Sequence, residues 1–148
     1  MAQIDSVAQN LQDSFGNYRL IKSPNPVNLT ATGNAVIALP ILGGGTGGTT
    51  QYVLRRITAS ILSNTAGGTA PNAATANISI GTTNDGANLV VSGQTLANLT
   101  GSGTYQDLTL AAGTTTNTYT ANALFVNVNT SVANAQCYIT VYGDIQTF

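Results

Sequence analysis

The chain has 148 residues, and four small residue types (Thr, Ala, Asn and Gly) make up half of it, while Leu, Ile, Val and Phe supply about a quarter, so we expect one folded domain. It contains no His, Glu or Trp, only four Lys and Arg against five Asp, and a single Cys. This composition excludes most general acid–base mechanisms, a zinc site and a basic nucleic-acid surface, so we expect no enzyme, no cofactor, no metal and no nucleic-acid partner.

The first residues carry the helical pattern of the chain. Ile4, Val7, Leu11 and Phe15 recur at helical spacing, which predicts a short amphipathic helix over 2–15, with a partly disordered terminus as the alternative. No basic region precedes an apolar run, and no stretch is long enough to span a membrane, so we expect a protein made in the cytoplasm without a membrane partner.

Residues 16–49 are rich in Pro and Gly. The run Ser23-Pro24-Asn25-Pro26 favours extended backbone, with short extended pieces on either side of it at 18–22, 27–31 and 34–39. The glycines between 43 and 48 match G-x-G-x-x-G, but no helix is expected after them and no Lys follows, so they indicate a linker. We therefore expect residues 1–49 to form an arm and linker, and residues 50–148 to form the core domain.

From residue 50 onward, short runs of β-branched and small polar residues predict strands. In the first of them Arg55 and Arg56 interrupt the alternation, which suggests a bulge, and Asn84-Asp85-Gly86 predicts a hairpin turn. Residues 94–100 indicate a single helical turn or an irregular crossing. The expected strands are 52–62, 75–81, 87–91, 104–110, 118–129 and 136–142.

The last two strands alternate most regularly. Leu124, Val126 and Val128 share one face of the first strand, and Cys137, Ile139 and Val141 share one face of the second, so Cys137 is expected to be a buried thiol. The short connection 130–135 predicts a tight closing hairpin between them.

With the pieces at 27–31 and 34–39, this gives about eight strands without intervening helices. Helices between strands would be needed for parallel pairing, so the sheets are expected to be antiparallel. We predict an all-β, jelly-roll-like β-sandwich of about eight strands with an extended N-terminal arm.

Charge is distributed unevenly along the chain. Residues 1–56 hold all four Lys and Arg with two Asp, and residues 57–148 hold three Asp and no cation. The front of the chain is therefore the better partner for an acidic surface, with ordinary solvated charges as the alternative. The expected outer surface of Thr, Asn, Ser and Ala suits a domain packed among copies of itself or on a larger scaffold.

The order of the segments YVLRRITASIL, ANISIGTT, ANLVV, TYQDLTL, YTANALFVNVNT and QCYITVYGDI resembles small jelly-roll capsid decoration, or cement, proteins of tailed bacteriophages. The similarity covers roughly residues 50 to 145, and its most specific part is Val141-Tyr142-Gly143-Asp144. The resemblance implies a homo-oligomer, with a trimer favoured, on the outer capsid surface of a virion. There it would tie neighbouring major capsid subunits together without catalysis.

Two groups of residues are candidates for docking onto the capsid. Ile4, Val7, Leu11 and Phe15 would form an apolar stripe, and four cations would meet acidic capsid groups. The alternative is internal: the stripe packs on its own sandwich, and the arginines pair with Asp107 or Asp144. The four cations are Arg19, Lys22, Arg55 and Arg56.

A tail-fibre, spike or adhesin-like module that binds a host surface or a glycan is the main functional alternative. Its six tyrosines could stack on sugars, although the absence of Trp weakens that interpretation, and Tyr138 and Tyr142 on one strand face suit a subunit interface equally well. A hydrolase would need two convergent carboxylates, and no two Asp residues lie close in the sequence.

Overall fold

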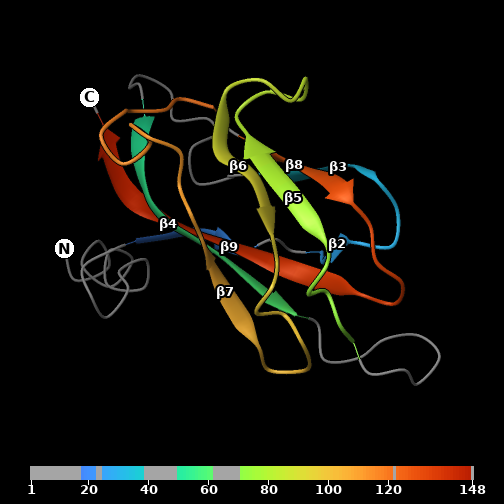
Figure 1. Cartoon of the computed structure of the whole chain (residues 1–148). Helices are drawn as coiled ribbons and strands as arrows, with labels where there is room; N and C mark the ends of the chain where they lie inside the picture. Colours follow the sequence, from blue (N-terminus) through green and yellow to red (C-terminus); the bar gives the residue numbers. More distant parts are fainter. Residues whose placement is uncertain (1–17, 23–24, 39–49, 62–70, 122, 148) are drawn as a thin grey trace.

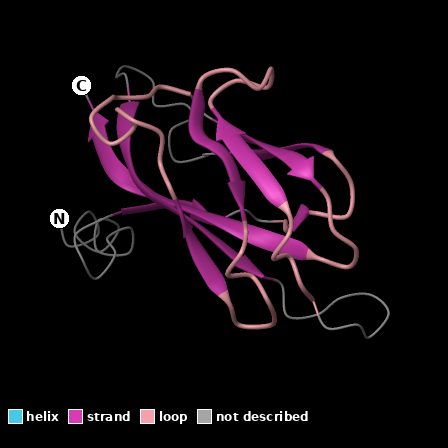
Figure 2. Ribbon diagram, in the orientation of Figure 1, coloured by secondary structure: helices cyan, strands magenta, loops and turns pink. Residues whose placement is uncertain are grey.

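A computed structural model of the chain describes residues 18–22, 25–38, 50–61, 71–121 and 123–147. These residues form nine strands and no helix (Figure 2). The strands are β1 (Tyr18–Lys22), β2 (Val27–Asn28), β3 (Gly33–Ala38), β4 (Thr50–Ile61), β5 (Asn77–Gly81), β6 (Leu89–Thr95), β7 (Tyr105–Leu108), β8 (Ala123–Thr130) and β9 (Gln136–Thr147).

The strands form two antiparallel sheets, which confirms the predicted all-β sandwich (Figure 1). The five-stranded sheet has the order β1-β9-β4-β7, with β2 also paired to β9, and the four-stranded sheet has the order β3-β8-β5-β6. The pairing is nested along the chain: β5 pairs with β6, β4 with β7, β3 with β8, and β1 and β2 with β9. Strands distant in sequence are thereby neighbours in each sheet.

The core lies between the two sheets and follows the predicted alternation. Leu124 and Val126 of β8 and Ile139 and Val141 of β9 are fully buried, as is Ile57 of β4. Burying each such side chain contributes roughly 1.5–3 kcal/mol to the free energy of folding. The alternating pattern in these strands therefore identified the core-facing residues correctly.

The described residues before position 50 belong to the sandwich. Strands β1 and β2 pair with β9, and β3 pairs with β8 over six residues, so residues 18–22 and 25–38 contribute to both sheets. This differs from the expectation of an arm over 1–49, because β9 and β8 each leave an edge that these short segments occupy. The predicted helix over 2–15 and the Gly-rich linker lie outside the described residues.

The connection 130–135 does not close a hairpin, and that prediction was wrong. Strand β8 lies in the four-stranded sheet and β9 in the five-stranded sheet, so the connection crosses between the sheets. Asn134 in this connection adopts a left-handed backbone conformation with φ 59°. Two backbone hydrogen bonds tie the connection to Leu29: the Leu29 N–H donates to the Ala135 carbonyl at 3.1 Å, and the Val132 N–H donates to the Leu29 carbonyl at 2.8 Å. A short turn can bridge two layers as well as two neighbouring strands, and here β2 and β4 already flank β9.

Other local predictions agree with the structure. The pairing of β4 with β9 shifts its register between Leu54 and Arg56, which places the predicted bulge at Arg55. Strands β5 and β6 form a hairpin around the turn 82–88. The crossing after β6 contains a single turn, in which the Leu99 N–H donates to the carbonyl of Leu96.

Candidate functional site

Three tyrosines lie on the outer face of the five-stranded sheet. Tyr138 and Tyr142 alternate along β9 with the buried core residues of that strand, and Tyr105 alternates along β7 with buried neighbours. Side chains that alternate with core residues in a sandwich point away from the core. We call this surface the tyrosine face and define it by Arg56, Thr58, Ser60, Tyr105, Asp107, Tyr138, Thr140 and Tyr142.

Strand register arranges these side chains in rows across the sheet. Ser60 of β4 lies opposite Tyr105 on one side and Tyr138 on the other. Thr58 lies between Asp107 and Thr140 in the next row. Tyr105 is 61% exposed, whereas Thr58 is only 8% exposed. The tyrosine face is therefore a surface of aromatic rings with short polar side chains between them.

Arg56 connects two sides of the tyrosine face. Its Nε donates to Asp107 Oδ1 at 2.8 Å, and its guanidinium carbon lies 5.4 Å from the ring centroid of Tyr142. The hydrogen bond to Asp107 raises the pKa of Arg56 above its ordinary value. Arg56 thus stays charged while it bridges a carboxylate and an aromatic ring, a geometry that suits guanidinium better than ammonium.

Arg55, at the bulge, has partners of its own. Its Nε donates to Asp144 Oδ2 at 2.6 Å, and its Nη1 donates to the Thr115 carbonyl at 2.9 Å. Both arginine pairs are exposed, so each contributes little to stability. The arginines thus have the internal partners, Asp144 and Asp107, that the alternative interpretation named, and neither presents an uncompensated charge to a capsid.

Of the other predicted docking residues, the structure describes only the two cations of β1. Arg19 and Lys22 belong to β1, where the backbone register places them opposite Tyr142 and Thr140 of β9. The apolar stripe lies outside the described residues and its docking role stays a prediction. Its members are Ile4, Val7, Leu11 and Phe15.

Sequence reasoning did not find that Tyr105 joins the tyrosines of β9. The two strands meet only through β4, whose pairing with both is nonlocal. In the sequence, Tyr105 and Asp107 alternate with Gln106 and Leu108. This alternation predicts that Tyr105 lies on the outer face of its strand, but it does not predict which sheet contains that strand.

The described residues offer little to nucleophilic or metal chemistry. Cys137 is fully buried, and burial raises the pKa of its thiol to about 12, so the thiolate is scarce at neutral pH. No group of three metal-ligating side chains gathers in the described part of the chain. Within the same ranges, no helix is long and apolar enough to cross a membrane.

Comparison with known proteins yields no relative: no protein-family model, no curated protein and no solved structure matches this chain significantly.

Proposed function

We propose that this protein is a structural virion protein, a capsid decoration protein that binds the outer surface of a bacteriophage head. In this role a homo-oligomer, with a trimer favoured, ties neighbouring major capsid subunits together. The protein acts by contact alone, without a cofactor.

The tyrosine face is the observation that carries this proposal. Tyrosine and arginine are enriched at protein–protein interfaces, and tyrosine buries a large area at low entropic cost. Here they stand on one face of a hydrogen-bonded sheet, and the charges of Arg56 and Asp107 compensate each other at 2.8 Å. A partner can cover such a surface without leaving an unpaired charge buried.

The strand order supports a jelly-roll fold, which is part of the proposal. First strands that pair with the last, and pairing that nests inward to a central β5–β6 hairpin, favour a jelly roll built from two Greek keys. The domain then offers two broad sheet faces for contact. Contacts repeated around a symmetry axis hold a lattice firmly even when each is weak, since later contacts form at high effective concentration.

The test uses the phage whose genome encodes the chain and a derivative in which the gene is deleted. Decoration predicts that the chain is a stoichiometric component of purified virions. It also predicts that heads without it release DNA at a lower temperature, and that adding the purified protein restores the original release temperature.

Measuring adsorption of the phage to its host distinguishes capsid decoration from the main alternative. A tail-fibre, spike or adhesin-like module would leave head stability unchanged on deletion and reduce adsorption. That result, or absence of the chain from virions, would contradict decoration.

A further inference from the structure

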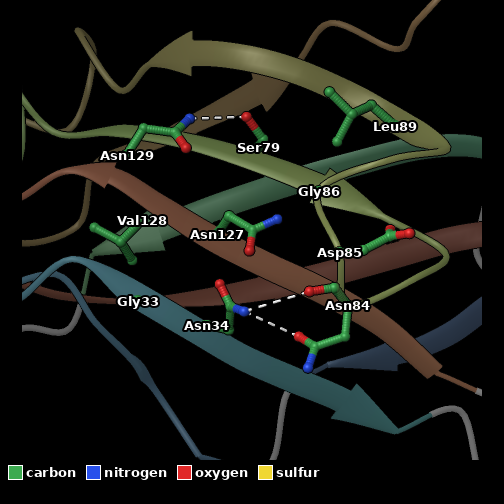
Figure 3. A pocket seen from close by; sticks show the side chains of 10 residues that line it. All are labelled: Gly33, Asn34, Ser79, Asn84, Asp85, Gly86, Leu89, Asn127, Val128 and Asn129. Atoms are coloured by element: carbon green, nitrogen blue, oxygen red, sulfur yellow. Dashed lines mark hydrogen bonds between the residues drawn. The ribbon is translucent and has the colours of Figure 1, made fainter.

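A polar hollow lies on the outer face of the four-stranded sheet (Figure 3). It encloses about 390 Å³, within the range of roughly 300–1,000 Å³ that small-molecule sites occupy. Strands β3, β5 and β8 form its floor and the turn 82–88 forms one wall. Its polar lining is Asn34, Ser79, Asn84, Asp85, Asn127 and Asn129.

The amides of the hollow are held in place by internal hydrogen bonds. Asn34 Nδ2 donates to Asn84 Oδ1 at 3.0 Å and so ties the turn to β3. On the other side, Asn129 Nδ2 donates to Ser79 Oγ at 2.8 Å and to Asn77 Oδ1 at 2.9 Å. Groups fixed in this way lose little conformational entropy when a ligand binds.

The wall of the hollow is fixed as well. Asp85 Oδ1 accepts hydrogen bonds from Thr83 Oγ1 at 2.6 Å and from the Ala87 N–H at 3.0 Å. These bonds, with that from Thr83 the larger cause, lower the pKa of Asp85, so the carboxylate is ionised at neutral pH. The Asp85 side chain is exposed at this wall and places a negative charge at the rim of the hollow.

Asn127 occupies the centre of the floor. The strand register places it opposite Asn34 on one side and opposite Ser79 on the other. Its side chain is half-buried and makes no hydrogen bond to any other residue that the structure describes. An amide has two donor hydrogens and an acceptor oxygen, so Asn127 can donate to one ligand group and accept from its neighbour.

The combination of groups selects a class of ligand. Amide donors and amide acceptors stand side by side on the floor, with a carboxylate at the rim, which matches adjacent hydroxyl groups that both donate and accept. Leu89, which is half-buried, adds apolar surface that C–H groups of a ring can contact. No Lys or Arg lines the hollow, so phosphate, sulfate or a sugar acid would meet the Asp85 carboxylate without compensation.

We propose that this hollow binds a neutral saccharide. The inference stands on the hollow alone and does not depend on the proposed role in a virion. A decoration protein with such a site would attach its particle to glycans as well as reinforce the head.

The test is a titration of the ¹⁵N-labelled full chain, followed by amide chemical shifts, with a panel of neutral mono- and disaccharides. Sialic acid, glucose 6-phosphate and CaCl₂ serve as comparison probes. We expect at least one neutral sugar to shift the amide signals of Asn34, Asn84 and Asn127 together.

Two variants locate the binding. Asn127→Ala removes an amide that has no partner among the described residues, so the fold should keep its melting temperature while affinity falls by roughly tenfold or more. Asn98→Ala is the matched control, since Asn98 is an exposed asparagine between β6 and β7 that does not line the hollow. It should bind as the wild type does.

Several results would overturn the inference. They are no response to any neutral sugar at tens of millimolar, binding that Asn127→Ala leaves unchanged, preferential binding of the acidic sugars, or a response of the hollow to Ca²⁺ alone. Because the titration uses the isolated chain, its failure would leave the virion role untouched, and absence from virions would leave the titration untouched.

Discussion

The buried thiol of Cys137 makes the stability of the protein depend on alkaline pH in a calculable way. Cys137 lies in β9 between β2 and β4, opposite Val27 and Ile61, and is fully buried. Desolvation raises the pKa of the thiol from 9.0 to about 12. The folded protein therefore retains this proton at pH values where the unfolded chain loses it.

The sign and size of the effect follow from that difference. The folded pKa exceeds the unfolded one, so the stabilising contribution is complete below about pH 9 and is lost as pH rises towards 12. Between pH 8 and pH 10 the unfolded thiol becomes mostly ionised while the native thiol does not. The wild type should lose about 1.4 kcal/mol more stability over this interval than Cys137→Ala, which has no thiol.

Urea denaturation of both proteins at several pH values, under reducing conditions, measures the difference. The alanine variant is expected to be less stable near neutral pH because its side chain is smaller, but only the change in stability with pH tests the prediction. The pKa of Tyr52 is also raised, by burial and then by Tyr119, and this acts equally on both proteins. Equal losses of stability in the two proteins, or rapid alkylation of native Cys137 at pH 8, would refute the reasoning.

Two further predictions concern packing, and both are measured by the free energy of unfolding. Gly81→Ala would place a Cβ 2.8 Å from the carbonyl oxygen of Ala87, so we expect a loss of roughly 1–3 kcal/mol, whereas Gly101→Ala, with no atom within 4 Å, should change stability by less than about 0.5 kcal/mol. A Gly81 variant as stable as the Gly101 variant would contradict the packing of the β5–β6 turn. Leu124→Ala should lower the free energy of unfolding by about 2–5 kcal/mol, because Leu124 is fully buried. Val36→Ala should be nearly neutral, because that side chain is 60% exposed. Similar losses of stability at the two sites would contradict the position of the core between the sheets.

The sequence pattern predicted the faces of single strands well. In β8 and β9 the alternation of large apolar and polar residues identified which side chains enter the core, because burial repeats with a period of two along a strand. The bulge at Arg55 was also predictable from the sequence. Successive side chains of a regular strand point to opposite faces, so one of the two adjacent arginines would otherwise enter the core.

What the pattern could not predict was which strands are neighbours. A connection as short as 130–135 suits a hairpin and an arch between sheets equally, and the choice depends on which edges other strands occupy. Here β9 is flanked by β4 on one side and by β1 and β2 on the other. For the same reason the sequence pattern predicts an arm over residues that include β1, β2 and β3, although these strands belong to the two sheets.

Both candidate sites arise from nonlocal pairing. Tyr105 reaches the tyrosines of β9 only because β4 lies between β7 and β9. The asparagines of the hollow come from β3, β8 and the turn 82–88, and the bond between Asn34 and Asn84 spans 50 residues. Alternate asparagines at 127 and 129 signalled an outer face, but not the residues that would stand opposite them.

The most direct test of the central claim, that the tyrosine face holds the protein on its lattice, is co-sedimentation of the purified chain with phage heads that lack it. Wild type should bind to saturation, and Tyr105→Ala should bind at least tenfold more weakly with an unchanged melting temperature, because Tyr105 is 61% exposed and carries no core packing. Val36→Ala, on the other sheet, serves as the control and should bind normally. Failure of the wild type to bind, or equal binding by Tyr105→Ala, would contradict the account.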